Sequence, residues 1–222
     1  YSLSTAFDVS SASYLNYYAS GVATQSMSFN NDGTKLFLLT SNQIREYSIS
    51  TGFDTTSSNV SVTTSTSLSS QDSTMTGVAF NNDGTKMFTV GAGNDKVYEY
   101  ALSTAFDVSS SSLSYTDSLS ISSQETAPTD IRFNSDGTKM YITGNEGRDI
   151  NEYTLSTAFD ISSTVTHKGS YSLISSDFYP SGFSFNNDGT KLFTTGASYD
   201  RVNEHSLTCL LYTSDAADEV VR

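Results

Sequence analysis

The stretch Phe133-Asn134-Ser135-Asp136-Gly137-Thr138-Lys139 has three near-copies elsewhere in this chain of 222 residues, at 29–35, 80–86 and 185–191. Asn at the first turn position suits a type I turn, where its side chain accepts a hydrogen bond from the backbone two residues on. Gly then adopts the left-handed conformation that closes the turn. The stretch therefore predicts a β-hairpin, in which eight residues have a structural turn role: Asp32, Gly33, Asp83, Gly84, Asp136, Gly137, Asp188 and Gly189.

A second motif, Tyr-x-(Leu/Ile)-Ser-Thr-(Ala/Gly)-Phe-Asp, occurs at 1–8, 47–54, 100–107 and 153–160. Its Phe residues are separated by 46, 53 and 53 residues, and the hairpin Asp residues by 51, 53 and 52. Two motifs that recur with nearly the same period indicate a repeat architecture.

One period divides into four predicted strands, at 129–133, 139–143, 150–155 and 164–173 in the third copy. A hairpin turn, a polar loop at 144–149 and a connection at 156–163 join them. Four short strands in about 53 residues is the size of one β-propeller blade. The fourth strand is the most polar, which is typical of the solvated outer edge of a sheet.

Along the chain this division predicts sixteen strands and an all-β fold of about four four-stranded blades in a single repeat region, 1–207. Two arrangements fit the count. The strands could close into a four-bladed ring, with an N-terminal strand completing the last blade, or they could form an arc of a larger propeller. Blades in propellers usually number from four to eight.

Composition supports the all-β prediction and excludes several partners. The aromatic residues are 14 Tyr and 13 Phe, which favour sheets. The formal net charge is −13, from 24 acidic and 11 basic residues, so we expect no nucleic-acid partner and no anionic membrane surface. No apolar run approaches the ~18 residues of a membrane-spanning helix, so we expect no membrane insertion.

The end of the chain departs from the repeat. From Cys209 the sequence reads Cys-Leu-Leu-Tyr-Thr-Ser-Asp-Ala-Ala-Asp-Glu, which looks like a translated adapter from a sequencing library. We therefore interpret 208–222 as a non-native tail and exclude it from the predicted fold. Cys209 is the only cysteine, so the repeat region itself contains no thiol.

The hairpin motif, followed within the repeat by Gly-x-x-x-x-Asp-x-(Val/Ile)-x-Glu-Tyr, resembles β-propeller repeats of the surface-layer and YVTN type. Together with Leu-Ser-Thr-Ala-Phe-Asp-Val-Ser-Ser, it is similar to repeat proteins of marine and viral metagenomes, including suspected components of phage tails and virions. The resemblance covers residues 1–207. It implies a propeller fold and an extracellular or virion-associated location, and it supplies no catalytic residues.

Three polar loops provide the candidate recognition residues Asp95, Asp149 and Asp200. The loops at 91–95, 144–149 and 196–200 vary in sequence on a constant scaffold, and recognition often resides in such loops. The first repeat lacks the equivalent Asp, since Thr40-Ser41-Asn42-Gln43-Ile44 is shorter. We expect no cofactor, with calcium at Asp and carbonyl oxygens as the one alternative.

Each repeat also contains a Glu that we expect to pair with the hairpin Lys of its own blade across adjacent strands. The predicted pairs are Lys35 with Glu46, Lys86 with Glu99, Lys139 with Glu152, and Lys191 with Glu204. Exposed pairs of this kind contribute only about 0.2–1 kcal/mol, so we expect them to set register more than stability.

The sequence favours a non-enzymatic structural or adhesive module that presents its loops to a protein or glycan surface. Near-identical repeats argue against an active site, which requires asymmetry. The alternative is a part of a propeller hydrolase or lactonase whose catalytic blades lie elsewhere. Fold alone does not decide between them, because propellers serve as enzymes and as binding modules.

Overall fold

The computed structural model describes residues 1–207, and the predicted tail at 208–222 lies outside the described residues. The described part contains seventeen strands and two short 3-10 helices, η1 (Val9–Ser11) and η2 (Ser57–Asn59). The strands are β1 (Ser2–Leu3), β2 (Ala12–Ser13), β3 (Ser26–Phe29), β4 (Lys35–Leu39), β5 (Gln43–Ile49), β6 (Val60–Ser67), β7 (Met75–Phe80), β8 (Lys86–Gly91), β9 (Lys96–Leu102), β10 (Leu113–Ser120), β11 (Pro128–Phe133), β12 (Lys139–Gly144), β13 (Asp149–Leu155), β14 (Val165–Ser172), β15 (Pro180–Phe185), β16 (Lys191–Gly196) and β17 (Arg201–Ser206).

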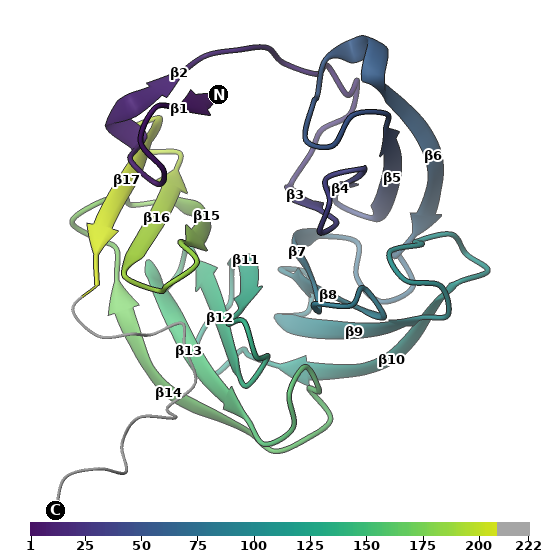
Figure 1. The fold of residues 1–222 in the computed structure, drawn as a ribbon. Helices are drawn as coiled ribbons and strands as arrows, with labels where there is room; N and C mark the ends of the chain where they lie inside the picture. Colours follow the sequence, from purple (N-terminus) through teal and green to yellow (C-terminus); the bar gives the residue numbers. More distant parts are fainter. Residues whose placement is uncertain (208–222) are drawn as a thin grey trace, which may run out of the picture.

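Four antiparallel sheets follow one another along the chain and are arranged around a central opening as the blades of a β-propeller (Figure 1). The first three blades have four strands each, β3–β6, β7–β10 and β11–β14. The fourth blade has three strands within the described residues, β15–β17. Strands β3, β7, β11 and β15 lie nearest the centre, and the polar strands β6, β10 and β14 lie at the outer edge (Figure 1). The predicted all-β propeller with about four blades is confirmed.

Of the two arrangements left open, the ring completed by an N-terminal strand is not found in residues 1–207, because no N-terminal strand pairs with the fourth blade. Strands β1 and β2 pair only with each other, and residues 14–25 form no strand. Figure 1 shows this small pair beside β17, with the chain from β2 to β3 crossing the top of the ring. The local turn of the Phe-Asp motif is retained in this segment, because it depends only on nearby residues.

The hairpin turns form as predicted, but their Asn and Asp side chains have different roles from those expected. In the first copy, Asp32 accepts the hydrogen bond from the backbone N–H of Thr34, two residues on, at 2.9 Å. Asn30 instead accepts from the N–H of Lys35, five residues on, at 2.9 Å. The four hairpin glycines have φ between 69° and 74°, so the left-handed turn position is confirmed in every copy.

The Phe of each connection is a second positive-φ position in the repeat. Phe53, Phe106 and Phe159 have φ between 51° and 60°, and each donates its N–H to the hairpin Gly carbonyl of its own blade at 2.9–3.0 Å. The Phe ring covers the hairpin Gly so closely that a Cβ on Gly84 would lie 2.2 Å from the ring of Phe106. Turn and connection therefore form one unit, in which only Gly fits beneath the ring.

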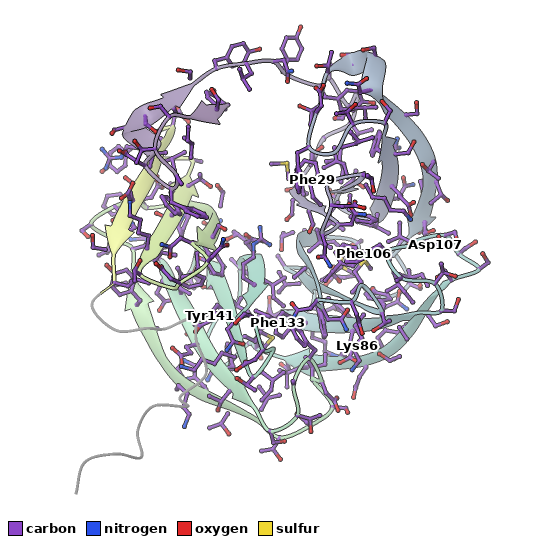
Figure 2. All side chains as sticks on the ribbon, in the orientation of Figure 1. Phe29, Lys86, Phe106, Asp107, Phe133 and Tyr141 are labelled. Atoms are coloured by element: carbon purple, nitrogen blue, oxygen red, sulfur yellow. The ribbon has the colours of Figure 1, made fainter. Side chains whose placement is uncertain are left out.

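The core is the set of apolar layers between neighbouring blades. Phe106 contacts Phe80 of its own blade and Phe37 of the first blade, with ring centroids 5.5 and 6.3 Å apart. At the next interface, Phe133 packs against Phe88 of the second blade at 4.5 Å. Figure 2 shows Phe106 and Phe133 among the side chains of these layers. Because the second and third sheets each lie between two neighbouring blades, their strands contain buried apolar residues on both sides.

The predicted Lys–Glu pairs are present in all four blades. The Nζ–Oε1 distances are 2.8, 2.7, 3.5 and 2.7 Å in the first to fourth blades. Within the first two pairs the carboxylates are buried, since Glu46 is 4% exposed and Glu99 5%. These two are therefore not ordinary surface pairs.

The same pairs hold the next blade, which the sequence did not reveal. Lys35 donates to the carbonyl of Phe106 at 2.6 Å, and Glu46 accepts from the N–H of Val108 at 3.1 Å. Lys86 and Glu99 bind Phe159 and Ile161 of the third blade in the same way, at 2.7 and 3.0 Å. We call this arrangement of Lys, Glu and the following blade's connection the interblade clamp.

Substitution of Gly84 by Ala should destabilise the fold, because Ala must adopt φ near 72° and its Cβ would collide with Phe106. The left-handed conformation alone costs a non-glycine residue about 1–2 kcal/mol, and the collision adds to it. Gly21→Ala tests the conformational term alone, since Gly21 has φ of 70° and no atom near its Cβ position. In urea denaturation the midpoint of Gly84→Ala should be lower than that of Gly21→Ala. The strand variant Gly169→Ala should have nearly the midpoint of the original chain. Equal midpoints for Gly84→Ala and Gly21→Ala would show that the ring contact is unimportant.

Replacement of Glu99 by Gln should lower the denaturation midpoint, because it leaves Lys86 partly buried without its carboxylate. We expect a loss of about 1–3 kcal/mol, the range for removing one partner of a buried charged hydrogen bond. Glu204→Gln is the matched control, since the Glu204 side chain is 29% exposed against 7% for Glu99. If Glu204→Gln lowers the denaturation midpoint as much as Glu99→Gln does, burial of the carboxylate is not what makes the clamp stabilising.

Candidate functional site

Three four-residue loops join the second and third strands of the last three blades: 92–95, 145–148 and 197–200. The flanking pairs are Gly91 with Lys96, Gly144 with Asp149, and Gly196 with Arg201. The last loop residue has positive φ in each: Asp95 at 52°, Arg148 at 54° and Asp200 at 49°. The predicted alignment of Asp149 with Asp95 and Asp200 is therefore wrong by one residue, because Arg148 holds the equivalent place.

The three predicted site residues do not form one cluster, since each belongs to a different blade. Asp149 is the first residue of β13 and accepts a hydrogen bond from the Asn151 side chain at 2.8 Å. Asp95 uses its backbone carbonyl to accept from the N–H of Ile121 at 2.9 Å. Residues 1–207 contain no group of three or more His, Cys, Asp and Glu side chains that could hold a metal ion.

A buried carboxylate that sequence reasoning missed supports each loop. Asp72, Glu125 and Asp177 are 1–2% exposed and lie in the connection that enters each of the last three blades. Glu125 accepts from the backbone N–H groups of Ala127, Glu146 and Gly147 at 2.7, 3.1 and 3.0 Å. Each loop is therefore held in place by a buried carboxylate, whose negative charge is stabilised by hydrogen bonds from backbone N–H groups of the loop.

A repeating signal for these carboxylates was present in the sequence. Each acidic residue stands four positions after the buried apolar residue that follows the outer strand: Leu68, Ile121 and Leu173. The first repeat has Gly21 and Val22 in the corresponding region and also lacks the four-residue loop. Loop and carboxylate occur together and are missing together, which supports their structural dependence.

Four exposed apolar side chains lie in the loop of the fourth blade and in the connection that enters this blade. Ile174, Phe178, Tyr179 and Tyr199 are 50%, 42%, 57% and 50% exposed. The N–H of Phe178 donates to the Ser198 hydroxyl at 3.1 Å, so the entering connection and the loop are joined. We call these four residues the blade-4 aromatic patch.

Two arginines flank the blade-4 aromatic patch. The guanidinium carbon of Arg148 lies 5.4 Å from the centre of the Phe178 ring, and that of Arg201 lies 4.7 Å from the Tyr199 ring. Cation–π contacts at such distances contribute about 0.5–1 kcal/mol at exposed sites. The rings are thus held in position while their outer surfaces remain in solvent.

The patch is a departure from the repeat. The second blade has Ser69, Ser73, Thr74 and Asn94 at the equivalent positions, and the third has Ser122, Thr126, Ala127 and Gly147. Large exposed apolar residues replace small or polar ones at one place on an otherwise constant scaffold. The equivalent residues of the other two blades show that the fold itself does not require them.

A second departure is the ion pair on inner strand β11. Asp130 and Arg132 are the only ionisable residues on the inner strands, and their side chains are 2.9 Å apart. Arg132 also donates to the carbonyl of Val78 at 3.0 Å, and Asp130 accepts from the N–H of Phe183 at 3.3 Å. Burial raises the pKa of Asp130 despite the neighbouring Arg132. The pair joins the second, third and fourth blades near the central opening.

No protein-family model and no curated protein matches the chain. Among solved structures, a candidate 6-phosphogluconolactonase from Bacteroides fragilis is similar, with a TM-score of 0.52 and 13% identity over 81% of this chain and 49% of that one. A second candidate 6-phosphogluconolactonase, from Bacteroides uniformis, has a TM-score of 0.54 and 9% identity over 84% and 54%. A chain of the mitotic checkpoint complex has a TM-score of 0.54 and 12% identity over 83% and 50%.

At these identities the similarity concerns the fold alone. The chain spans about half the length of the solved structures it matches. Within residues 1–207 the structure has no helix of the length and apolarity needed to cross a bilayer.

Asp177 gives the loop support a measurable pH dependence. Burial opposes its ionisation, but hydrogen bonds from Tyr179, Ser198 and Tyr199 outweigh it and lower the pKa of Asp177 from its ordinary value. A carboxylate whose pKa is lower in the folded state than in the unfolded state stabilises the folded protein at pH values above the unfolded-state pKa. This stabilisation is lost as the pH falls through the folded-state pKa.

Asp177→Asn should therefore destabilise the chain near pH 7, by about 1–3 kcal/mol, and its deficit should shrink below pH 4. Denaturation midpoints measured against pH provide the test. Asp200→Asn, at an exposed left-handed position that Asn tolerates, is the control and should change stability by less than about 0.5 kcal/mol. A deficit that is constant from pH 7 to pH 3 would contradict the proposed support.

Proposed function

We propose that this chain is a non-enzymatic binding module that presents the blade-4 aromatic patch to a partner protein. The observation that carries the proposal is the confinement of four exposed apolar side chains to one rim position, where the equivalent residues of other blades are small or polar. Solvent exposure of such residues is unfavourable, so their concentration at one place favours a binding role.

The chemistry of the patch favours a protein partner over a glycan. Tyr, Phe and Arg are the residue types enriched at protein interfaces, and binding energy concentrates in a few such side chains. Arg148 and Arg201 bring two positive charges to the patch of a chain whose net charge is −13. A partner with acidic groups around an apolar centre would complement this surface, and charge complementarity accelerates association.

Rigid support strengthens the proposal. Asp177 fixes the connection that carries Phe178 and Tyr179, through a 2.8 Å hydrogen bond from the Tyr179 N–H. Ala197 of the loop donates to the carbonyl of Tyr179 at 2.9 Å. A surface that is already ordered loses less conformational entropy on binding. We also retain the extracellular or virion-associated location as a proposal, which rests on the resemblance of the repeats.

The hydrolase alternative has one supporting feature, the non-repeating Asp130–Arg132 pair near the centre. Both side chains already have partners in neighbouring blades, and this favours a structural role for the pair. The likeness to candidate lactonases concerns the fold, and the binding proposal does not depend on it.

The test replaces the patch by the residues of the second blade: Ile174→Ser, Phe178→Ser, Tyr179→Thr and Tyr199→Asn. Acidic peptides selected from a displayed random library on the purified chain should bind the quadruple variant at least tenfold more weakly. Loss of a single hot-spot side chain accounts for 2 kcal/mol or more, about 30-fold in affinity. Val62→Ser with Tyr115→Ser, on the outer strands, removes exposed apolar residues elsewhere and should leave binding unchanged.

A glycan array probed with the same proteins decides the partner class. If the original chain binds glycans on the array, the quadruple variant does not, and no selected peptide depends on the patch, then the partner is a glycan and not a protein. Peptides that bind the quadruple variant as tightly as the original chain would contradict the proposal.

A further inference from the structure

A hollow of about 340 Å³ lies among the inner strands of the first three blades. Phe29, Phe80 and Phe133 contribute to its wall from strands β3, β7 and β11, and Ser28 and Arg132 are among its polar residues. Figure 2 shows Phe29 and Phe133 on the inner side of the first and third blades. Within residues 1–207, Arg132 is the one charged residue of this wall, although the net charge of the chain is −13. The hollow is therefore a positively charged place in an acidic protein.

Arg132 departs from the repeat together with its partner Asp130. The residues at the two equivalent positions of the other inner strands are small and uncharged: Ser26 and Ser28 on β3, Gly77 and Ala79 on β7, and Gly182 and Ser184 on β15. Those strands pair with their neighbours in the same register without a charged residue. The fold therefore does not require a guanidinium at this position.

The protein uses one nitrogen of the Arg132 guanidinium and leaves an edge free. Nη1 donates to the carbonyls of Val78 and Ile131 at 3.0 and 2.8 Å, and to the Asp130 carboxylate at 2.9 Å. Within the described part of the chain, no residue accepts a hydrogen bond from Nε or Nη2. The Arg132 side chain is 28% exposed, against 3% for that of Asp130. Two parallel N–H donors on one planar edge match the two oxygens of a carboxylate.

Asp130 positions the guanidinium. Besides its contact with Nη1, its carboxylate accepts a hydrogen bond from the N–H of Phe183 at 3.3 Å. Gly77 leaves the space for Asp130, since a Cβ on Gly77 would lie 2.7 Å from the Asp130 Cα. The structural role of the pair thus holds one side of the guanidinium still, and a donor group that is already ordered loses less conformational entropy when it binds a ligand.

We propose that this hollow binds a small carboxylate with an apolar body. The Nε–H and Nη2–H groups of Arg132 donate to the two carboxylate oxygens, and the rings of Phe29, Phe80 and Phe133 contact the apolar body. The site belongs to the first three blades, so it is separate from the blade-4 aromatic patch and does not depend on the function proposed for that patch.

The wall of the hollow favours a carboxylate over a phosphate. A phosphate presents charged oxygens on every side, whereas the hollow offers one guanidinium and several rings that cannot donate to such oxygens. Ligand sites usually have volumes of about 300–1,000 Å³, and a hollow of 340 Å³ is at the lower end of that range. A ligand of the size of benzoate is therefore the appropriate probe.

NMR of the ¹⁵N-labelled full chain tests the contact, because each arginine has its own Nε–H signal. Benzoate, added at constant ionic strength, should shift the Arg132 signal until it saturates, and acetate should bind more weakly because it lacks the apolar body. Lys96→Ala is the control, since it removes a positive charge outside the hollow and should bind benzoate as the original chain does.

Two sets of substitutions test the guanidinium, with benzoate affinity measured by ligand-observed NMR. Asp130→Gly combined with Arg132→Ala restores the residues of the second blade and leaves no buried charge unpaired, so the variant should fold and bind at least tenfold more weakly. Arg132→Lys preserves the positive charge beside Asp130 but lacks the planar edge, and it should also bind at least tenfold more weakly. Arg132→Lys decides the question if the double variant does not fold.

Three outcomes would overturn the proposal. The first is benzoate affinity that is unchanged in Arg132→Lys. The second is a benzoate titration that leaves the Arg132 signal in place. The third is inorganic phosphate that binds more tightly than benzoate, because the apolar wall would then contribute nothing to recognition.

Discussion

The packing of the first three blades depends on the Lys–Glu pairs of the first two, because each of these pairs binds the backbone of the following blade. The Lys–Glu pairs resemble cross-strand pairs of the kind that contribute little at a surface. Burial changes their role, because Glu46 and Glu99 use their second oxygen to accept an N–H from the following blade. A buried carboxylate is stable only where its hydrogen bonds are satisfied. The second and third blades therefore each satisfy polar groups of the blade before them and complete its apolar core, and this couples the three sheets.

Much of the architecture could be predicted because it repeats. The hairpin glycines, the Lys–Glu pairs and the polar outer strand each occur at fixed positions, and local turn chemistry determines them. The clamp to the next blade could not be predicted, since it joins Lys35 to Phe106 across 71 residues and depends on how two sheets face each other. The same limitation explains the N-terminal error. Residues 14–25 lie where a fourth strand was expected, but they form no strand, and pairing with another sheet is not decided by local sequence.

The sequence revealed less about the surroundings of the candidate site than about the fold, for a different reason. Asp95, Asp149 and Asp200 were grouped by residue type, but the backbone places Arg148 with Asp95 and Asp200. The groups that define the rim are Asp72, Glu125 and Asp177, which are hidden below it. Their spacing from a buried Leu or Ile was visible in the sequence, but burial is needed to distinguish a loop support from a surface acid. Solvent exposure is also needed to recognise Phe178 and Tyr199 as surface residues, because their aromatic character alone suggests that they lie in the core.

In a repeat protein, residues that recur in every blade mainly stabilise the scaffold, and residues that depart from the repeat are the candidates for recognition. The turn Asp occurs four times and has the same structural role in each hairpin. This recurrence is explained by the turn and does not indicate a catalytic residue. Ile174, Phe178, Tyr179 and Tyr199 have no such duty in the other blades, and the same backbone forms there with Ser, Thr, Ala, Gly or Asn.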